Sequence, residues 1–224
     1  MLVVLEGLDG AGKSTQVKLL RRYLTQKYGA VEYIHFPRYD APVYGELISR
    51  FLRGDFGDNG SVHPQLVALL FAEDRHGAAP DLQAALEEDR TVLLDRYVYS
   101  NIAYQCAKLD DPDARERLRN WIFRTEYGDF ALPEPDLNLF LDVPIGFVEQ
   151  SLSRQRDGED RAYLEGGRDI HEASLAFQKT VREMYLAETR RDSRFRRIDC
   201  SDGDGRMLAP EAIFARIKAA VDRV

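Results

Sequence analysis

The residues best suited to chemistry stand near the start of the chain, where glycines surround a lysine that is followed by two hydroxyl side chains. The pattern G-x-x-x-x-G-K-[ST] is filled by Gly7, Leu8, Asp9, Gly10, Ala11, Gly12, Lys13 and Ser14, with Thr15 directly after it. Glycines let the backbone curl so that its N–H groups point at phosphate oxygens, and a following helix adds its positive N-terminus. Lys13 would reach the β- and γ-phosphates, and the Ser14 hydroxyl would bind Mg²⁺. The motif therefore predicts binding of a nucleoside triphosphate such as ATP.

The motif alone does not say what is done with the triphosphate, but the rest of the sequence narrows the choice. The N-K-x-D motif that a GTPase should carry is absent from the sequence. Transport and helicase ATPases are usually larger and add coupling motifs that do not occur here. A chain of 224 residues therefore fits a small-molecule kinase, whose acceptor must bind facing the γ-phosphate.

Two segments at predicted strand ends carry arginines that could hold an acceptor phosphate. They are Phe36-Pro37-Arg38-Tyr39 after the second predicted strand and Asp95-Arg96 at the end of the third. The carboxyl ends of parallel strands open onto the ligand crevice, so Arg38 and Arg96 are expected to face the reaction centre. Arg96 can grip a phosphate bidentately, and the Asp95 carboxylate is placed to organise hydrated Mg²⁺.

A helical segment between these strands places an aromatic ring and a guanidinium on one face. Phe71 and Arg75 are four residues apart, which brings them to the same side of a helix. The ring could stack on a planar base while the guanidinium donates to a base carbonyl. The alternatives are that Phe71 belongs only to the core and that Arg75 pairs with Asp74 or another neighbour at the surface.

Taken together, these segments resemble thymidylate kinase, a nucleoside monophosphate kinase with a P-loop. The resemblance covers nearly the whole chain in five stretches: E-G-L-D-G-A-G-K-S-T, F-P-R-Y, L-F-A-x-D-R, D-R-Y-x-x-S-N-x-A-Y and P-E-P-D-L. It implies ATP-dependent phosphorylation of thymidine 5′-monophosphate (dTMP) to dTDP, with Mg²⁺ as cofactor. It also implies a homodimer, because the family is typically dimeric.

The resemblance further implies roles for single residues of the acceptor site. Asp9 would contact the 3′-hydroxyl of the acceptor sugar, and Phe71 would stack on thymine. Arg75 and Asn101 would bond the polar edge of the base, and Tyr104 would crowd the 2′ position and so disfavour a ribose. Simpler interpretations stay open, with Asp9 as a turn former, Asn101 as a helix cap and Tyr104 as a packing residue.

A mobile lid loop is expected at about residues 154–168, a stretch rich in Arg, Asp, Glu and Gly. Phosphoryl transfer requires positive charge at the transferring group, commonly an arginine. Some thymidylate kinases carry this arginine within the P-loop, but this chain has Gly10 there, so it resembles the arrangement in which the lid supplies it. Arg154 is the first choice, ahead of Arg156 and Arg161, and a solvated run of charges is the alternative. The stretch 157–167 is longer than the usual lid, and R-D-I-H-E at 168–172 departs from the family pattern.

The elements that must position these residues alternate along the chain. Strands are predicted at Leu2–Glu6, Val31–Phe36, Thr91–Asp95, Leu137–Asp142 and Phe195–Asp199, and helix starts at Pro42, Pro64, Pro112, Pro144 and Pro210. Several strands are apolar without alternation, as expected for parallel strands covered on both faces. This rhythm predicts the α/β class: a three-layer, doubly wound, five-stranded parallel sheet of the P-loop nucleoside monophosphate kinase fold, with residues 1–224 as a single domain.

Composition favours a cytoplasmic enzyme without nucleic-acid or membrane partners. A net charge of −7 lacks the positive field that a nucleic-acid coat needs, and no stretch approaches the roughly 18 apolar residues of a membrane span. Cys106 and Cys200 have no metal-ligand spacing and are interpreted as packing thiols of a reducing compartment. The four histidines, His35, His63, His76 and His171, show no triad or metal spacing and are interpreted as non-catalytic.

Alternative functions stay open at this point. Another nucleoside monophosphate kinase, or a deoxynucleoside kinase acting on thymidine, would share the fold. A deoxynucleoside kinase needs a carboxylate as general base, for which Glu6 or Asp9 could serve, but its two strand-end arginines would then lack an anion. A regulatory protein that uses the P-loop only as a switch would bind nucleotide without transferring phosphate.

Overall fold

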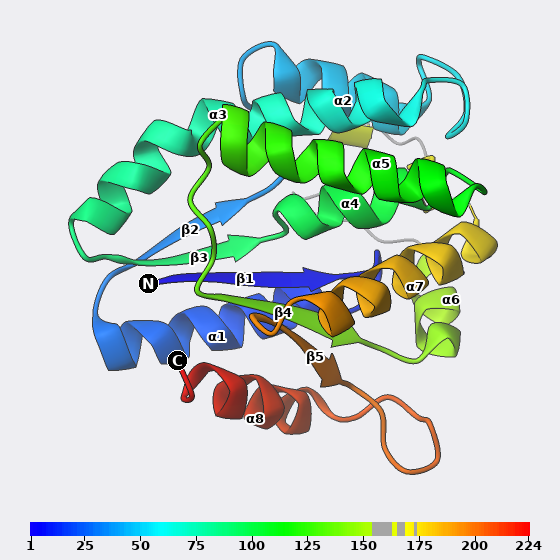
Figure 1. Ribbon diagram of the computed structural model, residues 1–224. Coiled ribbons are helices and arrows are strands. Elements are labelled where there is room, and N and C mark those ends of the chain that lie inside the picture. The colour runs from blue at the N-terminus through cyan, green and yellow to red at the C-terminus, as the bar shows by residue number, and fades with distance from the viewer. Residues whose placement is uncertain (154–162, 165–168, 173) are drawn as a thin grey trace.

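The computed structural model describes residues 1–153, 163–164, 169–172 and 174–224 (Figure 1). Its five strands form one parallel sheet in the order β2-β3-β1-β4-β5. They are β1 (Leu2–Gly7), β2 (Val31–His35), β3 (Thr91–Asp95), β4 (Leu137–Asp142) and β5 (Phe195–Asp199). All five predicted strands are confirmed, each within one residue of its expected bounds.

The central strand β1 explains why the sequence shows apolar runs instead of alternation. All of its residues are buried, because helices cover both faces of the sheet and shield the side chains on each face from water. Leu5 is in register with Asp95 of β3, and Gly7 with Leu141 of β4. The chain that leaves β1 therefore enters the P-loop directly beside the carboxyl end of β3.

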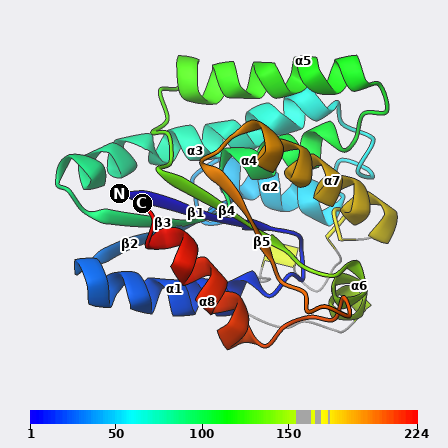
Figure 2. The same cartoon turned by 60° about the horizontal axis from the view of Figure 1, so that its bottom comes forward.

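Helices form a layer on each side of the sheet, as Figures 1 and 2 show from two directions. On one face lie α1 (Lys13–Tyr28) and α8 (Pro210–Val221), and on the other α3 (Pro64–Glu87), α4 (Val98–Cys106) and α7 (Leu175–Arg191). Further out, α2 (Tyr44–Arg53) packs on α3, and α5 (Pro112–Phe123) packs on α4, whereas α6 (Ile145–Ser153) follows β4. The predicted three-layer, doubly wound fold is thus confirmed.

The predicted proline starts hold for most of the helices. Pro64, Pro112 and Pro210 each occupy the first turn of a helix, where the missing N–H is no loss. Two positions differ slightly, since α2 begins two residues after Pro42 and α6 directly after Pro144. A π-helix that was not predicted, η1 (Arg124–Asp129), continues α5. Such turns are rare and occur often at functional sites.

Two groups of apolar side chains form the interior. The main core lies between the sheet and its helices, and it includes the buried faces of α1 and α8. A smaller cluster, Ile48, Phe51, Leu52 and Val67, joins α2 to α3. Both cysteines, Cys106 and Cys200, are free and buried, as packing thiols would be.

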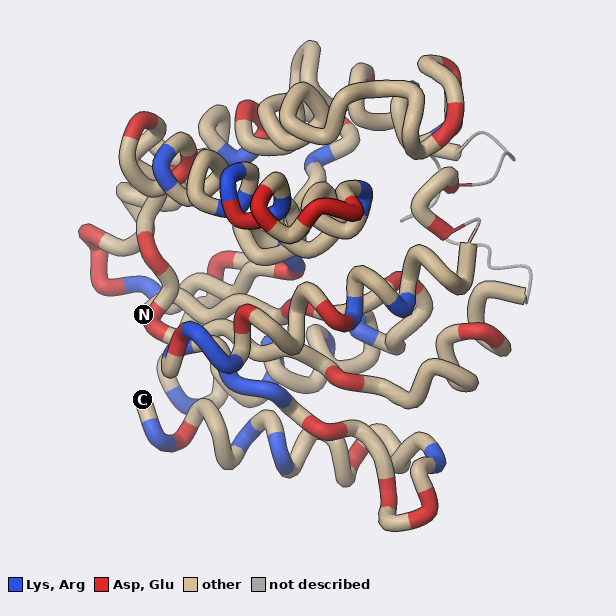
Figure 3. Tube along the Cα trace, turned by 45° about the vertical axis from the view of Figure 1, so that its right-hand side comes forward, with Lys and Arg blue, Asp and Glu red and all other residues tan. Residues whose placement is uncertain are grey.

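Charged positions of both signs are interspersed along the trace in Figure 3, as the modest net charge of −7 suggests. Among the described residues, no helix combines the length and the apolar character that crossing a bilayer requires. Most of the expected lid at 154–168 lies outside the described residues, and so do Arg154, Arg156 and Arg161.

Candidate active site

The P-loop between β1 and α1 depends on glycine at three positions. Gly10 and Gly12 have φ of 74° and 75°, a left-handed conformation that side chains disfavour. A Cβ on Gly7 would lie 3.3 Å from Cγ of Lys13, so the lysine stem lies back across this glycine. Because α1 begins at Lys13, the backbone N–H groups of Ser14 and Thr15 belong to the first turn of that helix, which suits an anion.

Asp95 and Arg96 mark the end of β3 beside this loop. Arg96 has a φ of 68°, and a non-glycine residue in that region is strained, a feature that clusters at functional sites. The Asp95 side chain is buried, with 5% of the residue exposed, and its Oδ1 accepts no hydrogen bond from the described residues. A buried carboxylate oxygen without a donor is suited to a cation.

Asp9 is fixed by three side chains: Arg96, which follows β3, Tyr104 of α4 and Gln178 of α7. Its carboxylate accepts hydrogen bonds from Arg96 Nη2 at 2.6 Å, the Tyr104 hydroxyl at 2.7 Å and Gln178 Nε2 at 3.1 Å. Burial acts to raise the pKa of Asp9, but the positive charges of Arg96 and Lys13 and the Tyr104 hydrogen bond outweigh it and lower the pKa to about 2. Asp9 is therefore an ionised, oriented acceptor at the mouth of the P-loop.

Glu6, the other carboxylate considered as a general base, is engaged elsewhere. It is fully buried in β1 and accepts hydrogen bonds from the Ser100 hydroxyl at 2.5 Å and the Tyr185 hydroxyl at 3.0 Å. The backbone N–H of Tyr97 also donates to it at 2.9 Å. Burial raises the pKa of Glu6. The carboxylate thus anchors α4 and α7 to the sheet, and it does not line the cavity described next.

A cavity of about 80 Å³ lies at the carboxyl ends of the strands, beside Asp9. Nearly all of the predicted substrate-binding residues line it, namely Asp9, Phe36, Pro37, Tyr39, Phe71, Arg75, Arg96, Asn101 and Tyr104. Typical small-molecule sites measure about 300–1,000 Å³, so this cavity is small. Its volume is reduced by Tyr163, which stacks on Tyr39 with ring centroids 3.9 Å apart, and by Asp169 and His171.

At one end of the cavity, the polar side chains of Arg75 and Asn101 form what we call the polar edge. Arg75 of α3 donates from Nε and Nη2 to Glu126 of η1 at 2.5 and 2.8 Å. Its third nitrogen, Nη1, takes no part in this ion pair. Asn101 of α4 donates from Nδ2 to the Ala68 carbonyl at 2.9 Å and to Glu126 at 2.8 Å. Its Oδ1 accepts no hydrogen bond from any described residue. Within the described part of the chain, the edge therefore combines a donor, Nη1 of Arg75, and an acceptor, Oδ1 of Asn101, that are not engaged in hydrogen bonds.

Comparison with known proteins identifies the family. A family model described as Thymidylate kinase matches residues 5–205. The chain belongs to the thymidylate kinase family. It is 34% identical over 186 residues to a thymidylate kinase of Mycobacterium tuberculosis (83% of this chain, 84% of that one). It is 33% identical over 224 residues to a probable thymidylate kinase of Pyrobaculum aerophilum (99% and 96%).

A solved structure supports the same assignment. The thymidylate kinase of Candida albicans, whose report describes the origin of its broad substrate specificity, superposes with a TM-score of 0.70 at 28% identity, over 99% of this chain and 91% of that one. The resemblance inferred from the sequence motifs is thus confirmed at the level of the whole chain.

Within this thymidylate kinase fold, Arg38 lies differently from the sequence-based expectation that it faces the reaction centre. Its Nε donates to Asp74 Oδ1 at 3.0 Å and its Nη2 to the Asp74 carbonyl at 2.5 Å, and it does not line the cavity. The physical reason is that the fully buried Asp74 carboxylate needs a cation nearby. A role of Arg38 in phosphate binding stays a prediction.

The two simple interpretations of Arg75 and Asn101 are wrong. Arg75 pairs with the buried Glu126, not with Asp74 or a surface neighbour. Asn101 lies inside α4, whose N-cap is Tyr97, so it does not cap the helix. Phe71 is half-buried and packs edge-on against Phe51, so it belongs to the small core cluster and also lines the cavity.

Several residues around the thymidylate kinase site gave no signal in the sequence. Glu126 and Gln178 lie 51 and 169 residues from their partners Arg75 and Asp9, so no local spacing connects them. His171 is buried and lines the cavity, and its Nε2 has no hydrogen-bond partner among the described residues. Burial lowers the pKa of His171 well below its ordinary value, and the ring is therefore neutral.

Proposed function

We propose that this chain transfers the γ-phosphate of ATP to dTMP, giving dTDP and ADP. Its membership of the thymidylate kinase family supports the reaction. The structural observation that carries the proposal is the cavity that joins Asp9 of the P-loop to the polar edge formed by Arg75 and Asn101. The acceptor sugar is proposed to bind beside Asp9, and the base beside Arg75 and Asn101.

The polar edge supports thymine as the base. Thymine presents a carbonyl acceptor, O4, next to an N–H donor, N3, and cytosine presents the opposite order at these positions. Nη1 of Arg75 can donate to the carbonyl, and Oδ1 of Asn101 can accept from the N–H. The amide cannot simply turn over, because its Nδ2 is already committed to Ala68 and Glu126. A cytosine would leave a buried donor and acceptor unpaired, which costs about 1–3 kcal/mol for each group.

The acceptor of the reaction is a phosphate oxygen, which is already a nucleophile, so the chain need not supply a general base. Its task is to align two anions and to neutralise their charge. Lys13 and Arg96 are proposed for this task, together with Arg38 and with Arg154 of the lid. The two arginines outside the lid lie at the ends of β2 and β3, where Arg96 is already held by Asp9.

Magnesium fits the residues that are present. Mg²⁺ favours one or two carboxylates, together with water and phosphate oxygens, and the free buried Oδ1 of Asp95 offers such a ligand. Ser14 and Asp95 are therefore proposed to hold the ion. When bound, Mg²⁺ would neutralise charge on the phosphates of ATP.

The remaining expectations form part of the same proposal. The chain is proposed to be a single domain, 1–224, whose lid at about 154–168 closes over the nucleotides and excludes water. It is proposed to be cytoplasmic, which the two free buried thiols support. It is also proposed to be a homodimer, as the family resemblance implies.

A panel of acceptors with MgATP tests this function. We expect ADP release with dTMP, weaker release with dUMP, and turnover at least about 100-fold slower with dCMP, AMP, GMP, UMP or thymidine. Preference for thymidine over dTMP would point to a deoxynucleoside kinase. Tight ATP binding without transfer to any monophosphate would point to a P-loop switch. Either outcome contradicts the proposal.

A further inference from the structure

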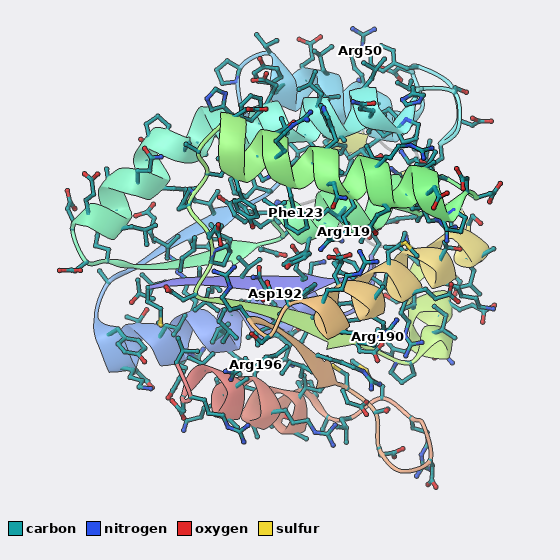
Figure 4. The ribbon with its side chains drawn as sticks, viewed as in Figure 1. Arg50, Arg119, Phe123, Arg190, Asp192 and Arg196 are labelled. Carbon is teal, nitrogen blue, oxygen red and sulfur yellow. The ribbon has the colours of Figure 1, made fainter. Side chains whose placement is uncertain are left out.

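A second cavity lies far from the P-loop in the fold, at the amino ends of the strands. Its volume is about 430 Å³, within the range of small-molecule sites. It lies between α5 and η1 on one side and the segment that joins α7 to β5 on the other. In Figure 4, Phe123 and Arg119 of α5 face Asp192, which follows α7. No residue of the candidate active site lines it.

The bottom of this cavity contains a polar group that the fold leaves unpaired. Asn138 is the second residue of β4, between Val4 and Phe195 in register, and is 2% exposed. Its Oδ1 accepts no hydrogen bond from the described residues, although buried polar atoms nearly always have a partner. A buried amide oxygen that accepts no hydrogen bond is unfavourable. A ligand with an N–H or O–H group would supply the missing hydrogen bond.

The rim of the cavity has an excess of positive charge. Arg119, Arg124 and Arg194 face two carboxylates, Glu134 and Asp192. Arg119 donates from Nε to both oxygens of Glu188 at 2.8 and 2.9 Å, and Arg194 donates to Glu134 at 2.7 Å. Arg124 is exposed and has no ion pair or hydrogen bond from its side chain within the described part of the chain. Its guanidinium is therefore available to an anion.

The wall between these groups is aromatic. The rings of Phe123 and Tyr127 stack at 5.7 Å with an angle of 22°, and Tyr99 meets Phe123 edge-on at 5.7 Å. The guanidinium carbon of Arg119 lies 4.7 Å from the centre of the Phe123 ring. A planar aromatic body packs well against such a surface.

We propose that this cavity is a second ligand site, which takes an aromatic anion carrying an N–H or O–H donor. The donor bonds Asn138, the aromatic body lies against Phe123 and Tyr127, and the anionic group pairs with Arg124. α4 and η1 contribute Tyr99 and Tyr127 to this cavity. They also carry Asn101 and Glu126 of the polar edge, so a ligand here contacts elements that form the proposed acceptor site.

The fluorescent probe 1-anilinonaphthalene-8-sulfonate combines these three features, an aromatic body, a sulfonate and an N–H. It is titrated into the full chain in the presence of saturating dTMP and ADP, which occupy the active site. We expect saturable binding of one probe per chain. Arg124→Gln should weaken it about fivefold, and Asn138→Leu should weaken it by at least as much. The control Arg117→Gln changes an arginine of α5, the helix that η1 continues. Its side chain is 71% exposed and pairs with Asp111, and the variant should bind the probe like the parent.

Three outcomes would overturn the proposal: no binding once dTMP and ADP are present, equal binding by the parent and both cavity variants, or equal weakening in the Arg117→Gln control. Thermal unfolding separates a folding defect from loss of the site. Arg124→Gln alters only an exposed side chain and should unfold at the parent temperature. Asn138→Leu removes an unpaired buried amide and should unfold at the same temperature or higher.

Discussion

Glu126 holds the guanidinium of Arg75 through two hydrogen bonds, from Nε at 2.5 Å and from Nη2 at 2.8 Å. The same carboxylate accepts from Nδ2 of Asn101 at 2.8 Å. One fully buried side chain on a π-helix therefore orients both residues that are proposed to read the base. Glu126 does not line the cavity, so it is proposed to act through these two neighbours.

We expect Glu126→Gln to raise the KM for dTMP about tenfold or more while changing kcat less, because a glutamine amide cannot accept from both nitrogens of Arg75. It should also reduce the preference for dTMP over dCMP, since Asn101 becomes free to turn its amide. Breaking a buried ion pair costs about 3–5 kcal/mol, so the unfolding temperature should fall as well. Steady-state kinetics with both acceptors and a thermal melt measure these effects.

Glu32→Gln is the matched control, because Glu32 pairs with Arg90 at 3.1 Å at the surface. Exposed pairs contribute about 0–1 kcal/mol, so kinetics and melt should stay close to the parent. If Glu126→Gln lowers the unfolding temperature but leaves the ratio of dTMP to dCMP turnover unchanged, the role of Glu126 is structural only.

A pair of substitutions at Tyr104 separates its ring from its hydroxyl. The hydroxyl donates to Asp9 at 2.7 Å, and the ring lies in the cavity wall. Tyr104→Phe should raise the KM for dTMP a fewfold, since one charge-assisted hydrogen bond to Asp9 is lost, and it should still exclude ribonucleotides. Tyr104→Ala should relax the preference for dUMP over UMP about tenfold, because space opens at the 2′ position. Equal dUMP to UMP ratios in both variants would contradict the steric role.

Local patterns explain why the fold and the P-loop could be predicted from the sequence. Five buried parallel strands need uninterrupted apolar residues, and a proline in the first turn of a helix loses no hydrogen bond. The glycines of the P-loop are required by backbone conformation at Gly10 and Gly12. These constraints act over a few residues, so the sequence records them directly.

The partners that fix the acceptor site could not be predicted, because they are set by tertiary packing. Arg75 has charged neighbours in sequence, yet its partner is Glu126, which the unpredicted π-helix brings under α3. Arg38 turns toward Asp74 because that carboxylate is fully buried, a property that no single-sequence pattern shows. Arg154 and most of the expected lid lie outside the described residues, so their predicted roles stay predictions.

Asp95→Asn tests the proposed magnesium site. The change keeps the shape of the side chain but removes the charge of an atom, Oδ1, that has no hydrogen bond within the described residues. The concentration of Mg²⁺ for half-maximal activity at fixed ATP should rise about 10- to 100-fold, with an unfolding temperature close to the parent. Asp113→Asn, an exposed position on α5, should leave the magnesium dependence unchanged. An unaltered magnesium dependence in Asp95→Asn would remove this residue from the site.

Lys108 is the last group whose environment makes a measurable prediction. Its ammonium lies 4.8 Å from the centre of the Phe51 ring and has no hydrogen-bond partner among the described residues. Burial lowers its pKa to about 7, which the negative charge of Asp169 only partly opposes. Between about pH 7 and the ordinary lysine pKa, the unfolded chain therefore holds one more proton than the folded one. The free energy of unfolding consequently rises with pH across this interval.

Lys108→Met removes the ammonium and keeps the length of the side chain. At pH 6.5 the variant should be more stable than the parent, by up to about 5 kcal/mol for a shift of this size. The gain should shrink steadily as the pH rises from 7 toward 10 and vanish above the ordinary lysine pKa, because only there is the parent lysine neutral in both the folded and the unfolded state. Urea unfolding at several pH values measures the difference. Lys18→Met, at an exposed position of α1, should show no such pH-dependent gain, and a constant gain for Lys108→Met from pH 6.5 to 10 would mean that lost charge is not the cause.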